Sequence, residues 1–182
     1  GCIDGVEVEL WGECYNIEET TELNLSNRGL TGQISPAVGE LINLTNLNLA
    51  INELNGEIPN EIENLINLEF LDLRNNQLTG EIPSGIGNLT NLIALRFSEN
   101  GLTGIIPSGI GNLVDLTYLY LDYNQLTGEI PIVISGLTNL NRLELNNNQL
   151  SGSIPSEIGD LTNLTKLHLQ NNDFIRQIPS EI

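Results

Sequence analysis

The sequence is poor in the residues that most chemical sites require. Its 182 residues include only 6 lysines and arginines, one histidine, two cysteines and no methionine. Because these 6 bases stand against 24 acids, the formal net charge is −18, and nucleic acids and anionic membrane surfaces would be repelled. One histidine and two cysteines leave no zinc constellation. We therefore expect no cofactor, no metal site and no nucleic-acid partner.

Long hydrophobic runs are also missing. No stretch of eighteen apolar residues occurs, so we expect no membrane insertion in this segment. The single histidine, His168, has nothing around it in the sequence that indicates the nucleophile and orienting acid of a catalytic site. We therefore expect no catalytic residue and no enzyme. Hydrophobic residues nevertheless make up 40% of the chain, a composition typical of a folded domain.

The two cysteines, Cys2 and Cys14, lie in residues 1–19, an N-terminal cap that reads as an irregular, acidic segment. We predict that they form a disulfide, because such a segment needs a covalent link, and hence that the chain is folded in an oxidising compartment. Two alternatives stay open. In one the thiols are reduced in a cytosolic cap. In the other, Gly1-Cys2 is the end of a bacterial lipoprotein cleavage site and Cys2 carries lipid.

A 24-residue period dominates the rest of the chain. Six full units cover residues 20–163, and a seventh, partial unit covers residues 164–182, with no insertion. Counted from the first residue of each unit, apolar residues recur at unit positions 1, 4, 6, 11, 15, 19 and 22, with Thr20 as the single exception. One unit cannot bury these residues alone, so the period predicts a stack of units with a shared core.

Each part of the unit predicts a local structure. Unit positions 4 to 6 alternate apolar and polar residues and predict a short strand with its leucines inward. Glycine at position 13 predicts a sharp turn, and the following Ile-Pro predicts an extended stretch before a short helical turn. Asparagine at position 9 predicts a structural ladder of inward amides that bond the backbone. The ladder comprises Asn52, Asn76, Asn100, Asn124, Asn148 and Asn172.

The unit pattern LxxLxLxxNxLxGxIPxxIGxLxN resembles the plant-type, 24-residue class of the leucine-rich repeat family over residues 20–182. The resemblance implies an α/β fold, namely a right-handed solenoid with a concave parallel β-sheet and short helical turns on the convex side. It also implies an extracellular or cell-surface location and a binding role. The cap in residues 1–19 is more similar to secreted repeat proteins of aquatic microbes than to plant receptors.

In such a solenoid, the side chains at unit positions 2, 3, 5, 7 and 8 project from the concave sheet. Four of the six basic residues lie at these positions, whereas most acids lie elsewhere. Aromatic side chains beside arginine are typical of recognition surfaces. We predict a binding site for a protein, peptide or glycan ligand at Phe70, Asp72, Arg74, Arg96, Tyr118, Tyr120, Asp122, Tyr123, Arg142 and Glu144. The alternative is that these positions only stabilise the sheet through cross-strand pairs.

Four sequons make Asn24, Asn43, Asn88 and Asn163 candidate N-glycosylation sites. Three of them read Asn-Leu-Thr, which the repeat pattern itself produces.

Two other functions compete with ligand binding. The last unit departs from the pattern at Phe174 and Arg176, and the chain stops at Ile182 without a cysteine cap. An uncovered solenoid end associates readily, which predicts a structural, adhesive or self-assembling surface protein. Ice binding is a minor alternative, which rests on a column of small polar residues at unit position 12: Thr31, Asn55, Thr79, Thr103, Thr127 and Ser151. Glutamates at the neighbouring position 14 would interrupt a flat ice-binding face.

Overall fold

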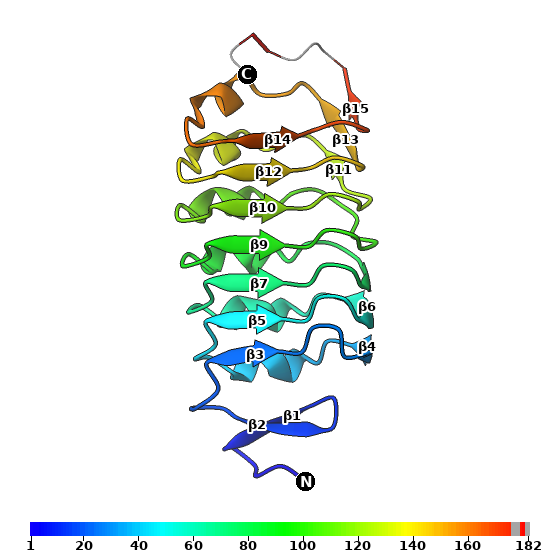
Figure 1. The fold of residues 1–182 in the computed structure, drawn as a ribbon, viewed down its shortest axis with the longest axis vertical. Coiled ribbons are helices and arrows are strands. Elements are labelled where there is room, and N and C mark those ends of the chain that lie inside the picture. Colours follow the sequence, from blue (N-terminus) through cyan, green and yellow to red (C-terminus); the bar gives the residue numbers. More distant parts are fainter. Residues whose placement is uncertain (176–178, 181–182) are drawn as a thin grey trace.

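Seven short parallel strands form one side of a solenoid of stacked coils (Figure 1). The structure is a computed structural model that describes residues 1–175, 179 and 180. The seven strands follow one another in chain order: β3 (Glu22–Asn24), β5 (Asn46–Asn48), β7 (Phe70–Asp72), β9 (Ala94–Arg96), β10 (Tyr118–Tyr120), β12 (Arg142–Glu144) and β14 (Lys166–His168). Each covers unit positions 3 to 5, one residue earlier than the alternation predicts. Backbone pairing nevertheless continues past the strand, since the Leu49 N–H donates to the Asp72 carbonyl at 2.8 Å.

Short 3-10 helices form the opposite side of the coils. They are η1 (Pro36–Glu40), η2 (Asn60–Asn64), η3 (Ser84–Asn88), η4 (Ser108–Asn112), η5 (Ile132–Gly136) and η6 (Ser156–Asp160). In five of them, a proline with an extended backbone directly precedes the first helical residue, so its rigid ring sets the direction in which the helix begins. The expected solenoid with a parallel sheet and short helical turns is therefore confirmed.

Two small parallel sheets lie along another side of the solenoid, and the sequence alternation did not predict them. One contains β4 (Thr31–Gln33), β6 (Glu53–Glu57) and β8 (Gln77–Thr79). The other contains β11 (Thr127–Gly128), β13 (Gln149–Gly152) and β15 (Asp173–Phe174). An isolated bridge between Glu81 and Thr103 lies between them in the chain. The residues at unit position 12, mostly threonine with one asparagine and one serine, lie along these sheets.

The N-terminal cap is a hairpin, so the expectation of an irregular segment was wrong. β1 (Glu7–Leu10) pairs antiparallel with β2 (Glu13–Asn16). The connecting residues Trp11 and Gly12 have φ values of +49° and +84°, and positive φ at both central residues matches the right-handed twist of a two-residue hairpin. Val8 and Leu10 are buried in the core, and the predicted disulfide joins Cys2 to Cys14.

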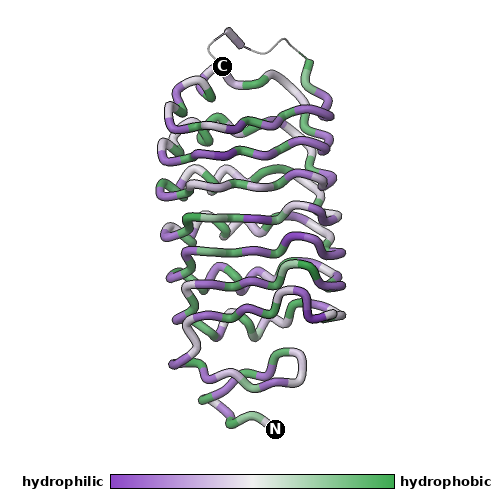
Figure 2. The backbone as a smooth tube through the Cα atoms, in the orientation of Figure 1, coloured by the Kyte–Doolittle hydropathy of each residue, from purple (hydrophilic) through white to green (hydrophobic). Residues whose placement is uncertain are grey.

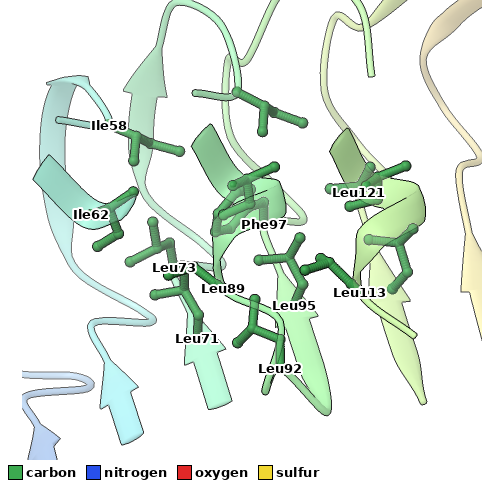
Figure 3. Close-up of a cluster of buried hydrophobic side chains, with 14 of the residues drawn as sticks. Ile58, Ile62, Leu71, Leu73, Leu89, Leu92, Leu95, Phe97, Leu113 and Leu121 are labelled. Carbon is green, nitrogen blue, oxygen red and sulfur yellow. The ribbon is translucent and has the colours of Figure 1, made fainter. Parts of the chain in front are cut away.

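The core is one continuous column of leucine and isoleucine between the strands and the helices. Figure 2 shows apolar segments recurring from coil to coil, and Figure 3 shows their side chains meeting in the interior. Phe97 replaces leucine at unit position 6 and is fully buried among them. Each coil therefore completes its core only by contact with its neighbours, as the repeat predicted.

The asparagines at unit position 9 connect consecutive coils. The Asn100 Nδ2 donates to the carbonyls of Leu73 and Phe97 at 3.0 and 3.1 Å, while its Oδ1 accepts from the Leu78 N–H at 3.1 Å. Asn124 repeats this arrangement one coil later, with its Oδ1 accepting from Leu102 at 3.0 Å. One amide thus bonds backbone groups of two coils, and the first unit lacks this residue because Arg28 occupies the position.

The prediction of end-to-end association depends mainly on residues at the C-terminal end that the structure does not describe. Arg176 and Ile182 lie outside the described residues. Self-association therefore stays a prediction.

Removing a ladder amide from the middle of the array will destabilise the fold. We expect Asn100→Ala and Asn124→Ala each to lower the free energy of unfolding by about 1–3 kcal/mol, because backbone groups of two coils lose their partner. Urea denaturation measures this change. Asn112→Ala, which alters an exposed asparagine at the end of η4, serves as the matched control. Equal losses for all three variants would contradict the structural role of the ladder.

Candidate functional site

Register places the concave side chains in two parallel rows. Unit position 3 contributes Phe70, Ala94, Tyr118 and Arg142, and these residues pair directly across β7, β9, β10 and β12. Unit position 5 contributes Asp72, Arg96, Tyr120 and Glu144 in the same register. Side chains at positions 3 and 5 point to the same face of the sheet because a strand alternates with period two. We call the surface formed by these two rows with Arg74, Asp122 and Tyr123 the concave patch.

Arg96 lies at the centre of the concave patch, against two tyrosines. Its guanidinium carbon is 5.8 Å from the ring centroid of Tyr118 and 5.5 Å from that of Tyr120. The two rings meet edge to face, with centroids 6.2 Å apart and planes at 71°. A cation near the faces of aromatic rings is attracted by their quadrupole, so the three side chains hold one another in place.

Asp72 connects both central arginines. Arg74 makes a bidentate contact with it, its Nε at 2.9 Å from Oδ1 and its Nη2 at 2.8 Å from Oδ2. Arg96 Nη1 approaches the same carboxylate at 3.6 Å. The hydrogen bond that Arg74 donates to Asp72 raises the pKa of Arg74 above its ordinary value, so Arg74 stays charged. Asp72 itself is 7% exposed, so its carboxylate is largely covered where it contacts the two arginines.

Asp122 is also largely covered. Its carboxylate accepts a hydrogen bond from the Ser98 hydroxyl, and both residues are buried. Sequence reasoning assigned Asp122 to the ligand-binding surface and did not single out Ser98. The contact between Asp122 and Ser98 can be recognised only when it is known that residues 24 apart are neighbours in the sheet and that both side chains are buried.

The other predicted residues differ in how far they reach solvent. Phe70 and Tyr123 are exposed, at 38% and 54%. Arg142 and Glu144 are half-buried beyond the tyrosines, and Glu144 lies 3.9 Å from His168. Tyr123 also has a φ of +53°, a left-handed conformation that is unfavourable for a bulky side chain. The patch thus combines a fixed centre around Arg96 with exposed aromatic residues on either side.

A hollow that sequence reasoning missed lies beside the concave patch, where the strands begin. We call it the leading-edge hollow. It has a volume of about 790 Å³, and its lining includes Glu69, Asn91, Ile93, Asp115, Tyr118 and Asn139. These residues come from unit positions 24, 2 and 3 of successive coils. Tyr118 belongs to both sites, so the hollow and the patch are continuous.

The candidate glycosylation sites differ in how their amides are used. The Nδ2 atoms of Asn43 and Asn163 donate to backbone carbonyls at 2.9 and 2.8 Å. Asn24 lies in β3, and its Oδ1 accepts from the Ser26 hydroxyl at 2.8 Å. Asn88 is exposed at the end of η3. Asn24 and Asn163 are exposed as well, whereas Asn43 is half-buried.

Comparison with protein families identifies the class of the chain. A family model described as a leucine-rich repeat region matches residues 22–122, and two further leucine-rich repeat models match residues 115–137 and 138–181. Together with the solenoid and its asparagine ladder, these matches show that the chain belongs to the leucine-rich repeat family. No curated protein sequence matches it.

Solved plant structures resemble the fold. The chain is 44% identical to the ectodomain of the Arabidopsis thaliana receptor kinase GASSHO1/SCHENGEN3, in complex with CASPARIAN STRIP INTEGRITY FACTOR 2, with a TM-score of 0.83 over 85% of this chain and 18% of that one. It is 39% identical to the Arabidopsis receptor kinase HAESA, in complex with the peptide hormone IDA and the co-receptor SERK1, with a TM-score of 0.85 over 88% and 27%. A plant ice-binding protein is 30% identical, with a TM-score of 0.67 over 90% and 60%. The chain thus spans less than a third of either receptor ectodomain.

Loss of the Asp72 charge will weaken the fold at the patch. We expect Asp72→Asn to lower the free energy of unfolding by about 1–3 kcal/mol, because a buried group that bonds two charged side chains is neutralised. Chemical denaturation is the measurement. Asp160→Asn removes the same charge from an exposed site at the end of η6 and should leave stability within about 0.5 kcal/mol. A neutral effect of Asp72→Asn would show that the arginines do not depend on it.

Proposed function

We propose that the chain is an extracellular, non-enzymatic binding module that takes a protein or peptide ligand on its concave patch. The observation that carries the proposal is Arg96, which is held between Tyr118 and Tyr120 on an open sheet face. Fixed aromatic and arginine side chains lose little entropy on binding and usually supply most of the binding energy. The bidentate Asp72 contact adds to this pre-organisation.

Charge distribution supports the same face. Four of the six basic residues lie at concave strand positions, while the chain as a whole has a net charge of −18. A ligand approaching from other directions meets mainly carboxylates, whereas the patch contains both signs of charge. Such an arrangement favours basic or neutral partners and directs them to the patch.

The relatives and the cap support the proposed ligand class and location. Two of the similar plant structures are described as a receptor kinase in complex with the peptide hormone IDA and as a peptide hormone receptor in complex with RGF2. The Cys2–Cys14 disulfide is typical of an oxidising, extracellular environment. In the described part of the chain, no helix has the length and apolar character needed to cross a membrane. A glycan remains a second ligand class for the same patch, because tyrosine rings also stack on sugars.

Ice binding is the second candidate, and the similar plant ice-binding protein favours it. The position-12 column runs along the small sheets, but Glu57 and Glu81 lie in or beside the same strands. The hydroxyl of the exposed Thr127 donates to the Gly104 carbonyl of the preceding coil at 3.3 Å. Carboxylates beside the column, and a hydroxyl already bonded to the backbone, disfavour an ordered ice-like water layer. We expect no thermal hysteresis in the wild-type protein, and measurable hysteresis would restore this candidate.

Peptides selected against the protein will depend on the patch. A displayed random peptide library is enriched on the wild-type chain, and the affinities of the enriched peptides are then measured on an Arg96→Ala, Tyr120→Ala double variant. We expect at least about 30-fold weaker binding, since loss of one anchor commonly costs about 2 kcal/mol. Ile132→Ala, a truncation of an exposed side chain on η5, is the control and should retain affinity. Equal affinity for all three proteins would place the site elsewhere.

A further inference from the structure

A second row of asparagine amides runs along the edge at which the concave strands begin. Unit position 24 is asparagine in five units, and each Nδ2 donates to a backbone carbonyl of the preceding coil, or of the cap in the case of Asn43, at 2.8 to 3.0 Å. The row comprises Asn43, Asn67, Asn91, Asn139 and Asn163. These bonds join neighbouring coils on this edge, as the position-9 ladder does in the interior.

Asp115 interrupts this row. It occupies unit position 24 of the fourth unit, and a carboxylate accepts hydrogen bonds but cannot donate the one that its counterparts supply. The equivalent backbone carbonyl, that of Thr90, has no side-chain donor among the described residues. Asparagine at this position would restore the bond. The chain therefore lacks one stabilising contact at Asp115 and has a negative charge there instead.

The interruption lies within the leading-edge hollow. Asp115 and Glu69 are both exposed in the lining, and neither makes an ion pair among the described residues. The flanking amides of Asn91 and Asn139 use their Nδ2 atoms for the backbone, so their Oδ1 atoms remain as acceptors. The lining thus presents carboxylate and amide oxygens and contains no basic residue.

Tyr118 and Ile93 supply the apolar part of the same lining. Acceptor oxygens beside an aromatic ring suit a side chain that has an aliphatic stem and a positively charged donor head. Arginine and lysine have this form. Arg96 lies against the same tyrosine in the concave patch, so a ligand crossing the patch has the hollow directly beside it.

We propose that the leading-edge hollow binds a basic side chain, arginine or lysine, of a peptide ligand, with Asp115 and Glu69 as its counter-charges. The inference rests on the proposed function in that the peptide also crosses the concave patch. It adds the chemistry of the partner, since a ligand of this site carries a positive residue next to the segment that meets Arg96 and the tyrosines.

Asp115→Asn separates stability from binding. The variant restores the missing amide and should raise the melting temperature by about 2–4 °C, as one added hydrogen bond does in a domain of this size. The same variant removes one counter-charge and should weaken binding of a basic ligand. A substitution that only damaged the fold would lower both properties. A melting temperature that falls or stays unchanged would overturn the assignment of Asp115 as a break in the row.

Binding is measured with a defined probe, the peptide acetyl-Gly-Arg-Gly-amide, titrated at low ionic strength against the isotopically labelled full chain. The backbone NMR signals of Asn91, Asp115 and Asn139 report occupation of the hollow. The matched probe replaces arginine with citrulline, which keeps the shape and loses the charge. We expect about two- to fivefold weaker binding of the citrulline peptide to wild type and of the arginine peptide to Asp115→Asn, as for a partly exposed ion pair. Asp160→Asn should bind like wild type.

Three results would overturn the proposal. The first is that the citrulline peptide binds wild type as tightly as the arginine peptide does. The second is that the arginine peptide binds Asp115→Asn as tightly as wild type. The third is that calcium chloride shifts the NMR signals of the hollow and the arginine peptide does not. Ile132→Ala, on the helical side, leaves the hollow intact and should retain the arginine-dependent shifts. If the titration fails while library-selected peptides still depend on Arg96, only the assignment of the hollow falls. If the affinity of the selected peptides does not depend on Arg96, the proposed function is contradicted, whatever the result for the hollow.

Discussion

The stacking of coils in one fixed register is the constraint on which the rest of this molecule depends. No unit can bury its leucines alone, and each position-9 amide bonds the backbone of two coils. Inserting or deleting one residue in a strand would turn its leucines outward and break these bonds. Because both the leucine packing and the position-9 hydrogen bonds fix the register, residues 24 apart become lateral neighbours along the sheet. Asp72 and Arg96, on adjacent strands, meet for this reason.

Fixed register also explains how the proposed recognition surface forms without a deep cavity. The strands are rigid and their concave side chains are free to vary, so tyrosine, arginine and aspartate at corresponding positions assemble into a pre-organised group. Arg96 and the two tyrosines restrain one another, and the largely buried Asp72 contacts both Arg74 and Arg96. Such a surface meets a ligand with little loss of side-chain entropy. At its edge, Asp115 exchanges a stabilising bond for a charge.

The sequence predicted the features that recur in each unit. It did not predict the features that depend on contacts between particular side chains of neighbouring coils. Leucine spacing, the asparagines at position 9 and the Ile-Pro turns recur in nearly every unit, so the core, the concave sheet and the helical side followed from the period. The small sheets were missed because strands such as Thr127–Gly128 are too short and too rich in glycine to alternate. The cap hairpin was missed although Glu7-Val8-Glu9-Leu10 alternates polar and apolar residues, a pattern that predicts a strand. The burial of Asp72 and Asp122 depends on side chains one coil away, which no local pattern reveals, and Asp115 is informative only once the bonds of its counterparts are known.

Photo-crosslinking from the concave patch tests the central claim, that this face carries the ligand site, most directly. A photoreactive phenylalanine analogue is placed at Phe70, or at Ile132 on the helical side as the reference, and the folded chain is illuminated together with a peptide selected on the wild-type protein. Both positions are exposed, so both report on what lies against their own surface. The account predicts peptide adducts from position 70 and none from position 132. Adducts confined to position 132 would contradict it.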